Sequence, residues 1–417
     1  MTPSIRVVVA ATVAGLVGLG GAACSAEPAP PQGEASPTRT PIQLGPTSTS
    51  APTTIAAPLP DPTATPLPLP PPGPEDRTLG FEGAPVEFLV YSDFQSPNAA
   101  LGLESLLELR ERHPEAVRLV FRHFPVLAEY DKDSLAGQAA EAAGRQGLFW
   151  PMVQLLAIRH AEWSVLPPES FGDWLESQAP EIGVDPLSLR EDLTSGRYAG
   201  LMLQAFQDAT ALGVPGVPTI LLNGVPLRIS PTPLQLEAAV RLELLAARQY
   251  SAAPEMTLDS DSGYTATIRM RGGDLVIQLF PQAAPAAVNS FIFLAEEGFF
   301  DGTSFFRVDP GTVVEGGDPS ETGLGDPGYH LPDEIDPALS FDSAGMVALS
   351  SAGPGTNGSR FFINLQPLPS LTGTRTIFGR VIEGLDLLEE LDARDPALDL
   401  LAPGAAILRS VQIEESS

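Results

Sequence analysis

A single arginine stands inside an apolar, strand-forming run near the C-terminal end of the chain. Arg307 lies in the run Ser304–Val308 (SFFRV), and the glycine-rich turn Gly316–Pro319 (GGDP) follows it. A second glycine-rich turn leads into another aromatic run, Arg360–Ile363 (RFFI). A charge within a strand is costly unless it lies at a surface or in a pocket. Because a guanidinium stays protonated at working pH, Arg307 is suited to act as a permanent hydrogen-bond donor in such a pocket.

These segments and their flanking motifs resemble the cyclophilin family of peptidyl-prolyl isomerases from about Tyr264 to Leu391. The flanking motifs follow the family's order: AVNSF at 287–291, GFFDGT at 298–303, GLGDPGY at 323–329, DE at 333–334, IFGRV at 377–381 and EGL at 383–385. The resemblance implies a mainly-β barrel. The short alternating strands and few helices after Tyr264 independently favour a closed antiparallel barrel.

The resemblance also implies catalysis of cis–trans isomerisation at prolyl bonds, which needs no covalent chemistry. Amide resonance sets a barrier of about 18–20 kcal/mol. A catalyst needs an apolar pocket for the proline ring and a donor aimed at the proline amide, whose nitrogen becomes a better acceptor once the amide is twisted. The resemblance assigns the donor to Arg307 and pocket walls to Phe362 and Leu371. Alternatively, these are an ordinary exposed arginine and barrel-core residues.

On the same basis we predict a wider substrate-binding set. It consists of Phe305, Val313, Glu315, Ser350, Phe362, Leu371 and Arg375. Phe305 is alternatively a core residue of the strand that carries Arg307. No cofactor and no metal is expected.

Several of these positions depart from the family pattern. Glu315 stands where a glutamine normally orients the arginine, so its carboxylate could hold Arg307 more tightly or lock it in an ion pair and weaken its donation to substrate. The other departures are Thr312-Val313 for Phe-Met, Ser350-Ser351 for Ala-Asn, Arg360 for glutamine, Arg375 for histidine, and Ser370 where many eukaryotic members have tryptophan. Fold and peptide binding are therefore predicted more firmly than rapid turnover.

Residues 79–250 resemble a thioredoxin fold with an inserted helical subdomain, as in periplasmic disulfide oxidoreductases. The expected order is β-α-β, a helical insertion, then β-β-α. Strands are expected at 86–91, 117–121 and after the loop at 213–218, and helices at 99–112, 135–145, 149–160, 171–178, 197–211 and 233–248. The segment Ser96–Ala99 (SPNA) occupies the position of the family's Cys-x-x-Cys motif. Thiol–disulfide exchange requires a thiolate, so redox activity is excluded.

Ser96 is predicted to be a helix N-cap with Pro97 at the first helical position. The alternative, a hydrolytic nucleophile, needs a nearby general base that the sequence does not indicate. Pro218 matches the cis-proline of the fold and could be a structural relic or shape a groove for an extended peptide. This domain is thus expected to bind peptides or to act as a spacer.

Residues 1–24 have the form of an export signal and resemble a bacterial lipoprotein signal, in which Cys24 would be lipidated. The alternatives are cleavage with release or an uncleaved anchor. Cys24 is the one cysteine, so no intramolecular disulfide is possible. Residues 25–78 are rich in Pro, Thr and Ser and are expected to form a disordered stalk or spacer.

The sequence contains 52 acidic and 23 basic residues, a formal net charge of −29. Nucleic acid and anionic membrane surfaces are not expected as partners, because both need a basic patch. The four histidines show no metal-ligand spacing. We therefore predict a multidomain protein of the cell envelope, anchored to the membrane by lipid, in which residues 255–417 isomerise proline-containing exported polypeptides. The rival hypothesis is a chaperone or proline-peptide-binding protein without catalysis.

Overall fold

The computed structural model describes residues 69–416. The predicted export signal, Cys24 and nearly all of the predicted stalk lie outside this range. Within it, no helix combines the length and the apolar character needed to cross a membrane.

The N-terminal domain is built on a mixed five-stranded sheet with the order β1-β3-β2-β4-β5. The central strands β2 (Val86–Ser92) and β3 (Val117–His123) run parallel, and β4 (Thr219–Leu222) is antiparallel to β2. β1 (Arg77–Leu79) and β5 (Val225–Pro226) form the edges. The predicted β-α-β, helical insertion, β-β-α order is confirmed, and β1 is an addition that its short polar sequence did not indicate.

Helices supply the rest of this domain. They are α1 (Pro97–Arg112), α2 (Asp133–Arg145), α3 (Phe149–Ile158), α4 (His160–Trp163), α5 (Pro168–Gln178), α6 (Pro186–Thr194), α7 (Ala199–Ala211) and α8 (Pro233–Ala246). The single helix predicted at 149–160 is divided at Arg159. Helix α6 was not predicted, although Asp185 caps it through a hydrogen bond from the Ser188 amide and Pro186 opens it.

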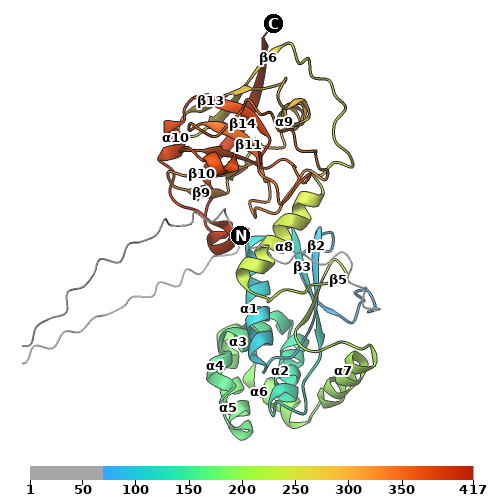
Figure 1. The fold of residues 1–417 in the computed structure, drawn as a ribbon. Helices are drawn as coiled ribbons and strands as arrows, with labels where there is room; N and C mark the ends of the chain where they lie inside the picture. The colour runs from blue at the N-terminus through green and yellow to red at the C-terminus, as the bar shows by residue number, and fades with distance from the viewer. Residues whose placement is uncertain (1–68, 417) are drawn as a thin grey trace, which may run out of the picture. The chain divides into compact units, whose positions relative to one another are not determined.

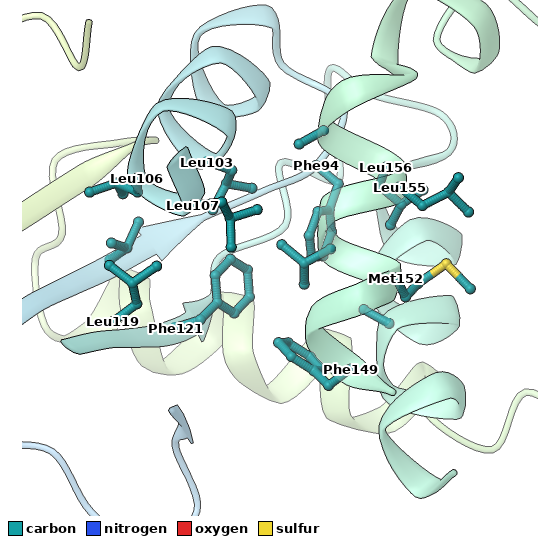
Figure 2. Packing of buried hydrophobic residues seen from close by; sticks show 14 of the residues in the cluster. Phe94, Leu103, Leu106, Leu107, Leu119, Phe121, Phe149, Met152, Leu155 and Leu156 are labelled. Carbon is teal, nitrogen blue, oxygen red and sulfur yellow. The ribbon is translucent and has the colours of Figure 1, made fainter. Parts of the chain in front are cut away.

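The core of this domain forms where α1 and α3 pack on the sheet. Leu103, Leu106 and Leu107 recur at helical spacing, so α1 presents one apolar stripe. Figure 2 shows this stripe facing Phe121 of β3, with Phe94 from the loop before α1 between them and α3. The Phe94 and Phe121 rings stack at 5.3 Å. This packing fixes the N-terminal end of α1, which is where the Cys-x-x-Cys motif of disulfide oxidoreductases would lie.

The C-terminal domain is a nearly closed antiparallel barrel with one long helix, α9 (Pro285–Glu296) (Figure 1). Its strands are β6 (Gly263–Met270), β7 (Asp274–Leu279), β8 (Ser304–Phe305), β9 (Arg307–Asp309), β10 (Val313–Gly316), β11 (Met346–Leu349), β12 (Phe361–Asn364), β13 (Ile377–Glu383) and β14 (Ala405–Ser416). The strand order is β8-β14-β6-β7-β13-β11-β12-β10-β9. The strand order begins with β8 and ends with β9, and only Phe306 separates these two strands in the chain. The two ends of the sheet therefore come together, which makes the barrel nearly closed.

Candidate active site

Strand register places three candidate side chains and a fourth residue, Ala348, in one row across the barrel wall. Arg307 of β9 lies opposite Glu315 of β10, and Glu315 lies opposite Phe362 of β12. Phe362 in turn lies opposite Ala348 of β11. Directly opposed residues in antiparallel strands project to the same face. The register therefore gathers the predicted donor and the predicted pocket wall on one face of the sheet.

The apolar part of this face is a small cluster separate from the main barrel core. Its buried members are Val313, Phe341, Met346, Ala348, Phe362 and Ile377. Phe341 and Phe362 stack with ring centroids 5.6 Å apart. Leu371, from the short 3₁₀ helix Pro369–Leu371, packs at its edge and is partly exposed. The six named members are buried, and partly exposed side chains such as Leu371 lie at the cluster's edge. The cluster therefore provides apolar surroundings, which a proline ring requires, on the sheet face that carries Arg307.

Phe305 does not join this cluster. Its side chain is fully buried in the main barrel core, where its ring lies 6.4 Å from that of Phe361. The reason is the change of strand partner at Phe306: β8 pairs with β14, whereas β9 pairs with β10. The prediction of Phe305 as a substrate-binding residue is therefore not supported, and the alternative of a core residue describes its position.

The polar part of the face is centred on Glu315, which is only 5% exposed. Its Oε1 lies 3.6 Å from Nη1 of Arg307. Burial raises the pKa of Glu315 above its usual value, although the charges of Arg307, Arg360 and Arg375 and a hydrogen bond from Ser350 act in the opposite direction. Arg307 keeps 16% of its side chain exposed. The Arg307 guanidinium is thus held by a carboxylate, while part of the Arg307 side chain stays exposed.

Arg360 and Arg375 flank this pair and bond to main-chain oxygens. Arg375 Nη1 donates to the Ser351 carbonyl at 3.0 Å and to its hydroxyl at 2.7 Å. Arg360 Nη1 donates to the Gly323 carbonyl. Among residues 69–416, neither guanidinium has a carboxylate within 4.0 Å. Both arginines therefore bring positive charge to the site that no neighbouring side chain neutralises through an ion pair.

The GGDP motif shapes the loop that Arg360 contacts. Gly317 has φ +86°, and a Cβ there would lie 2.3 Å from the Ser359 carbonyl oxygen, so only glycine fits. The buried Asp318 carboxylate accepts hydrogen bonds from the amides of Ser320, Gly323 and Gly325, at 2.8, 2.8 and 3.0 Å. Asp318 was absent from the predicted site. An aspartate directly after two glycines is typical of a turn in which the carboxylate accepts hydrogen bonds from nearby amides, so the sequence could have indicated its role.

The thioredoxin-like domain has its own buried polar group at the start of α1. Ser96 occupies the N-cap position with Pro97 next, as predicted, but its hydroxyl makes no capping bond. Instead it donates to Asp93 Oδ1 at 2.5 Å, and its amide donates to Oδ2 at 2.7 Å. Burial, and the nearby Asp93, raise the pKa of Asp133 to about 7. Sequence reasoning missed the Asp93 partner, although it lies only three residues before Ser96.

The predicted cis bond is present between Val217 and Pro218. In the part of the chain from 69 to 416, no three His, Cys, Asp or Glu side chains are grouped closely enough to hold a metal ion. Pro218 lies near Gly102 of α1. A side chain introduced at Gly102 would bring its Cβ to 3.6 Å from Cγ of Pro218. The proline loop therefore packs beside the helix that Ser96 begins.

Comparison with known proteins agrees with this two-domain description. Residues 265–413 match the family described as cyclophilin type peptidyl-prolyl cis-trans isomerase/CLD, and residues 73–241 match one described as thioredoxin. The chain is 43% identical over 122 residues to peptidyl-prolyl cis-trans isomerase-like 1 of Gibberella zeae, covering 28% of this chain and 75% of that protein. It is 40% identical over 133 residues to peptidyl-prolyl cis-trans isomerase B of Bacillus subtilis, covering 32% and 93%.

A crystal structure of a cyclophilin-type isomerase from Cryptosporidium parvum aligns at 32% identity with a TM-score of 0.34, over 37% of this chain and 99% of that one. The sequence relatives are similar over most of their own length. Through residues 265–413, the chain belongs to the cyclophilin family of peptidyl-prolyl cis-trans isomerases.

Proposed function

We propose that the barrel accelerates prolyl isomerisation with Arg307 as the donor and the Phe362 cluster as the proline pocket. The observation that supports this assignment most strongly is the row Arg307–Glu315–Phe362–Ala348, which joins a partly exposed guanidinium to an apolar patch on one sheet face. A proline ring seated on Phe362 brings its amide toward Arg307. Val313, Leu371, Ser350 and Arg375 line the rest of the proposed site.

The chemistry is stabilisation of a twisted amide. Rotation removes the conjugation between nitrogen and carbonyl, and the nitrogen lone pair becomes a hydrogen-bond acceptor. A donor that strengthens as the amide twists lowers the barrier selectively, and each 1.36 kcal/mol gives about a tenfold increase in rate. The guanidinium meets this need because it remains protonated and presents several N–H groups in one plane.

Glu315 has two opposite effects on this donor. It fixes the orientation of Arg307 through the 3.6 Å ion pair, and its charge reduces the positive potential that the amide nitrogen experiences. Because Glu315 is buried, the second effect is poorly screened by water. We therefore infer an enzyme whose donor is well ordered but weakened when Glu315 is ionised.

We further propose that the chain acts outside the cytoplasm on exported polypeptides, with Cys24 as a lipid anchor. Support comes from the signal-like residues 1–24 and the Pro/Thr/Ser-rich segment that follows. Metabolic labelling with an alkyne fatty acid in the producing cell, followed by Cys24→Ser, tests the anchor. Labelling that persists in the variant, or that is absent from the parent, would contradict it.

The thioredoxin-like domain is proposed to bind peptides or to space the barrel from the membrane. Ser-Pro-Asn-Ala replaces the redox motif, and Cys24 lies far away in sequence, before the domain begins. Since exchange requires a thiolate at the motif, the domain contributes no disulfide chemistry.

Refolding of a protein limited by prolyl isomerisation distinguishes the enzyme from the rival chaperone. We expect the full chain to accelerate the slow phase, Arg307→Ala to lose most of the effect, and Arg269→Ala, an exposed arginine on β6, to retain it. Suppression of aggregation that is equal in all three proteins, without acceleration by any, would favour the binding protein.

A further inference from the structure

Two arginines of the proposed site have no ion-pair partner among residues 69–416. Three guanidinium groups, those of Arg307, Arg360 and Arg375, act on the one buried carboxylate of Glu315. Glu315 forms its ion pair with Arg307, whereas the other two arginines bond to the carbonyls of Gly323 and Ser351. Carbonyl oxygens satisfy the N–H donors but do not neutralise the charge. The guanidinium groups of Arg360 and Arg375 are left without an ion-pair partner in the described residues.

These arginines lie beside the proline pocket. Arg360 directly precedes β12, the strand that carries Phe362, and its charge acts on Glu315. Arg375 precedes Ile377 of the apolar cluster by two positions and reaches Ser351, next to Ser350, which bonds Glu315. Both arginines are half-buried, which weakens screening of their charge by water.

These arginines lie in a chain whose formal net charge is −29, so acidic side chains far outnumber basic ones overall. One further carboxylate lies on β9, that of Asp309, which is exposed and opposite Val313. The buried Asp318 carboxylate belongs to the loop that Arg360 contacts, but it accepts its hydrogen bonds from the amides of Ser320, Gly323 and Gly325. Among residues 69–416, neither Asp309 nor Asp318 forms an ion pair with Arg360 or Arg375. A substrate carboxylate would supply the missing counterion, and Arg–carboxylate hydrogen bonds are among the stronger ones in proteins.

We propose that this site selects proline-containing polypeptides that carry an aspartate or glutamate side chain close to the proline. The proposal rests on the proposed isomerase function and names its substrate class. Arg360 and Arg375 are the specificity-determining residues. Neutral sequences remain substrates, and basic side chains next to the proline are disfavoured by like charge.

The test uses the full chain and three matched peptides with Glu, Gln or Lys directly before the proline, and a second set with the change directly after it. Proline exchange is measured by NMR. We expect at least one Glu peptide to be exchanged about tenfold more efficiently than its Gln counterpart, since hydrogen bonds to charged groups exceed neutral ones by about that factor. The preference shrinks as salt is added.

Substitutions at Arg360 and Arg375 test whether these residues cause the preference for Glu peptides. Arg360→Gln and Arg375→Gln are each expected to reduce the Glu/Gln ratio, and the double variant to bring it close to one, whereas Arg375→Lys keeps most of it. Arg380→Gln is the matched control, because Arg380 is exposed on β13 and outside the site. Circular dichroism verifies folding, and if one glutamine variant fails to fold, loss of the Glu/Gln ratio in the other decides the assignment.

Two results would overturn the proposal. The first is equal exchange of the Glu, Gln and Lys peptides in both sets by the parent. The second is a preference that persists in the double variant. If no peptide is exchanged at all, the proposed isomerase function fails separately, and NMR titration of the same peptides decides the charge preference: tighter binding of a Glu peptide supports it, and equal binding overturns it.

Discussion

Replacing Glu315 by glutamine tests how the buried carboxylate affects the proposed donor. The substitution keeps the size and one acceptor oxygen of the side chain, so Arg307 can still be oriented by a hydrogen bond. It removes the negative charge 3.6 Å from the guanidinium. Glutamine is also the residue that the cyclophilin resemblance leads one to expect at this position.

The magnitude follows from the geometry. Two unit charges 3.6 Å apart interact by about 4–5 kcal/mol at an effective dielectric constant of about 20. Most of this is offset by desolvation of the carboxylate, and only the part felt at the amide nitrogen affects catalysis. A hydrogen bond from a fully charged donor exceeds one from a neutralised donor by roughly 1–1.5 kcal/mol. We therefore expect Glu315→Gln to raise kcat/KM for a neutral peptide about tenfold.

The assay is NMR exchange on a neutral Ala-Pro peptide at several pH values. Because burial raises the pKa of Glu315 above its usual value, acidification protonates it while Arg307 stays charged. Parent activity should rise as the pH falls, whereas the variant should show a flat profile. Glu383→Gln, an exposed change on β13, is the control and should behave as the parent. Lower activity in Glu315→Gln, or identical pH profiles, would refute the reasoning.

Three further predictions concern the scaffold. Gly317→Ala should destabilise the barrel by at least about 2 kcal/mol in chemical denaturation, because it combines positive φ with a clash; unchanged stability would contradict this. Arg122 donates to both carboxylate oxygens of Asp76, at 2.7 and 2.8 Å, and to two proline carbonyls before β1. Arg122→Ala should therefore make the segment before β1 more sensitive to protease. Cleavage of the parent and the variant at equal rates would contradict this. Burial raises the pKa of Asp133 in the folded state to about 7, from an ordinary 3.8. Between these two pH values the folded state binds a proton that the unfolded state has lost, so the free energy of unfolding should fall as the pH rises from about 3.8 to about 7. Asp133→Asn should flatten this pH dependence, and an unchanged dependence would contradict the prediction.

The sequence predicted the architecture well because the motifs combine turn chemistry with strand patterning. The GGDP turn, the aromatic run around Phe362 and the AVNSF motif at 287–291 each limit local geometry strongly. In the structure, α9 spans Pro285–Glu296 and strand register places Phe362 opposite Glu315. Local signals of this kind were sufficient to put Arg307 beside an apolar patch.

Phe305 shows where such reasoning fails. Phe305 and Arg307 are two residues apart, a spacing that places side chains on one face of a continuous strand. The strand is interrupted at Phe306, and its two halves pair with different neighbours. A change of partner depends on barrel closure, which is a long-range property, so the position of Phe305 could not be read from the local pattern.

The polar contacts around Ser96 and around Glu315 could not be predicted from the sequence either. The bond from Ser96 to Asp93 replaces the capping bond that the helix signal predicted. The grouping of Arg360 and Arg375 around Glu315 depends on three separate segments that meet only in the folded barrel. The substitutions at positions 360 and 375 were visible in the sequence, but only the structure shows that both arginines lie near Glu315 and lack an ion-pair partner among residues 69–416.

The most direct test of the account is NMR exchange spectroscopy of a proline-containing tetrapeptide with the full chain and its Arg307→Ala variant. We predict that the parent accelerates cis–trans exchange and that the variant loses most of this acceleration while still binding the peptide through the Phe362 cluster. Peptide binding by both proteins without acceleration by either would contradict the account and identify the barrel as a receptor for proline-containing chains.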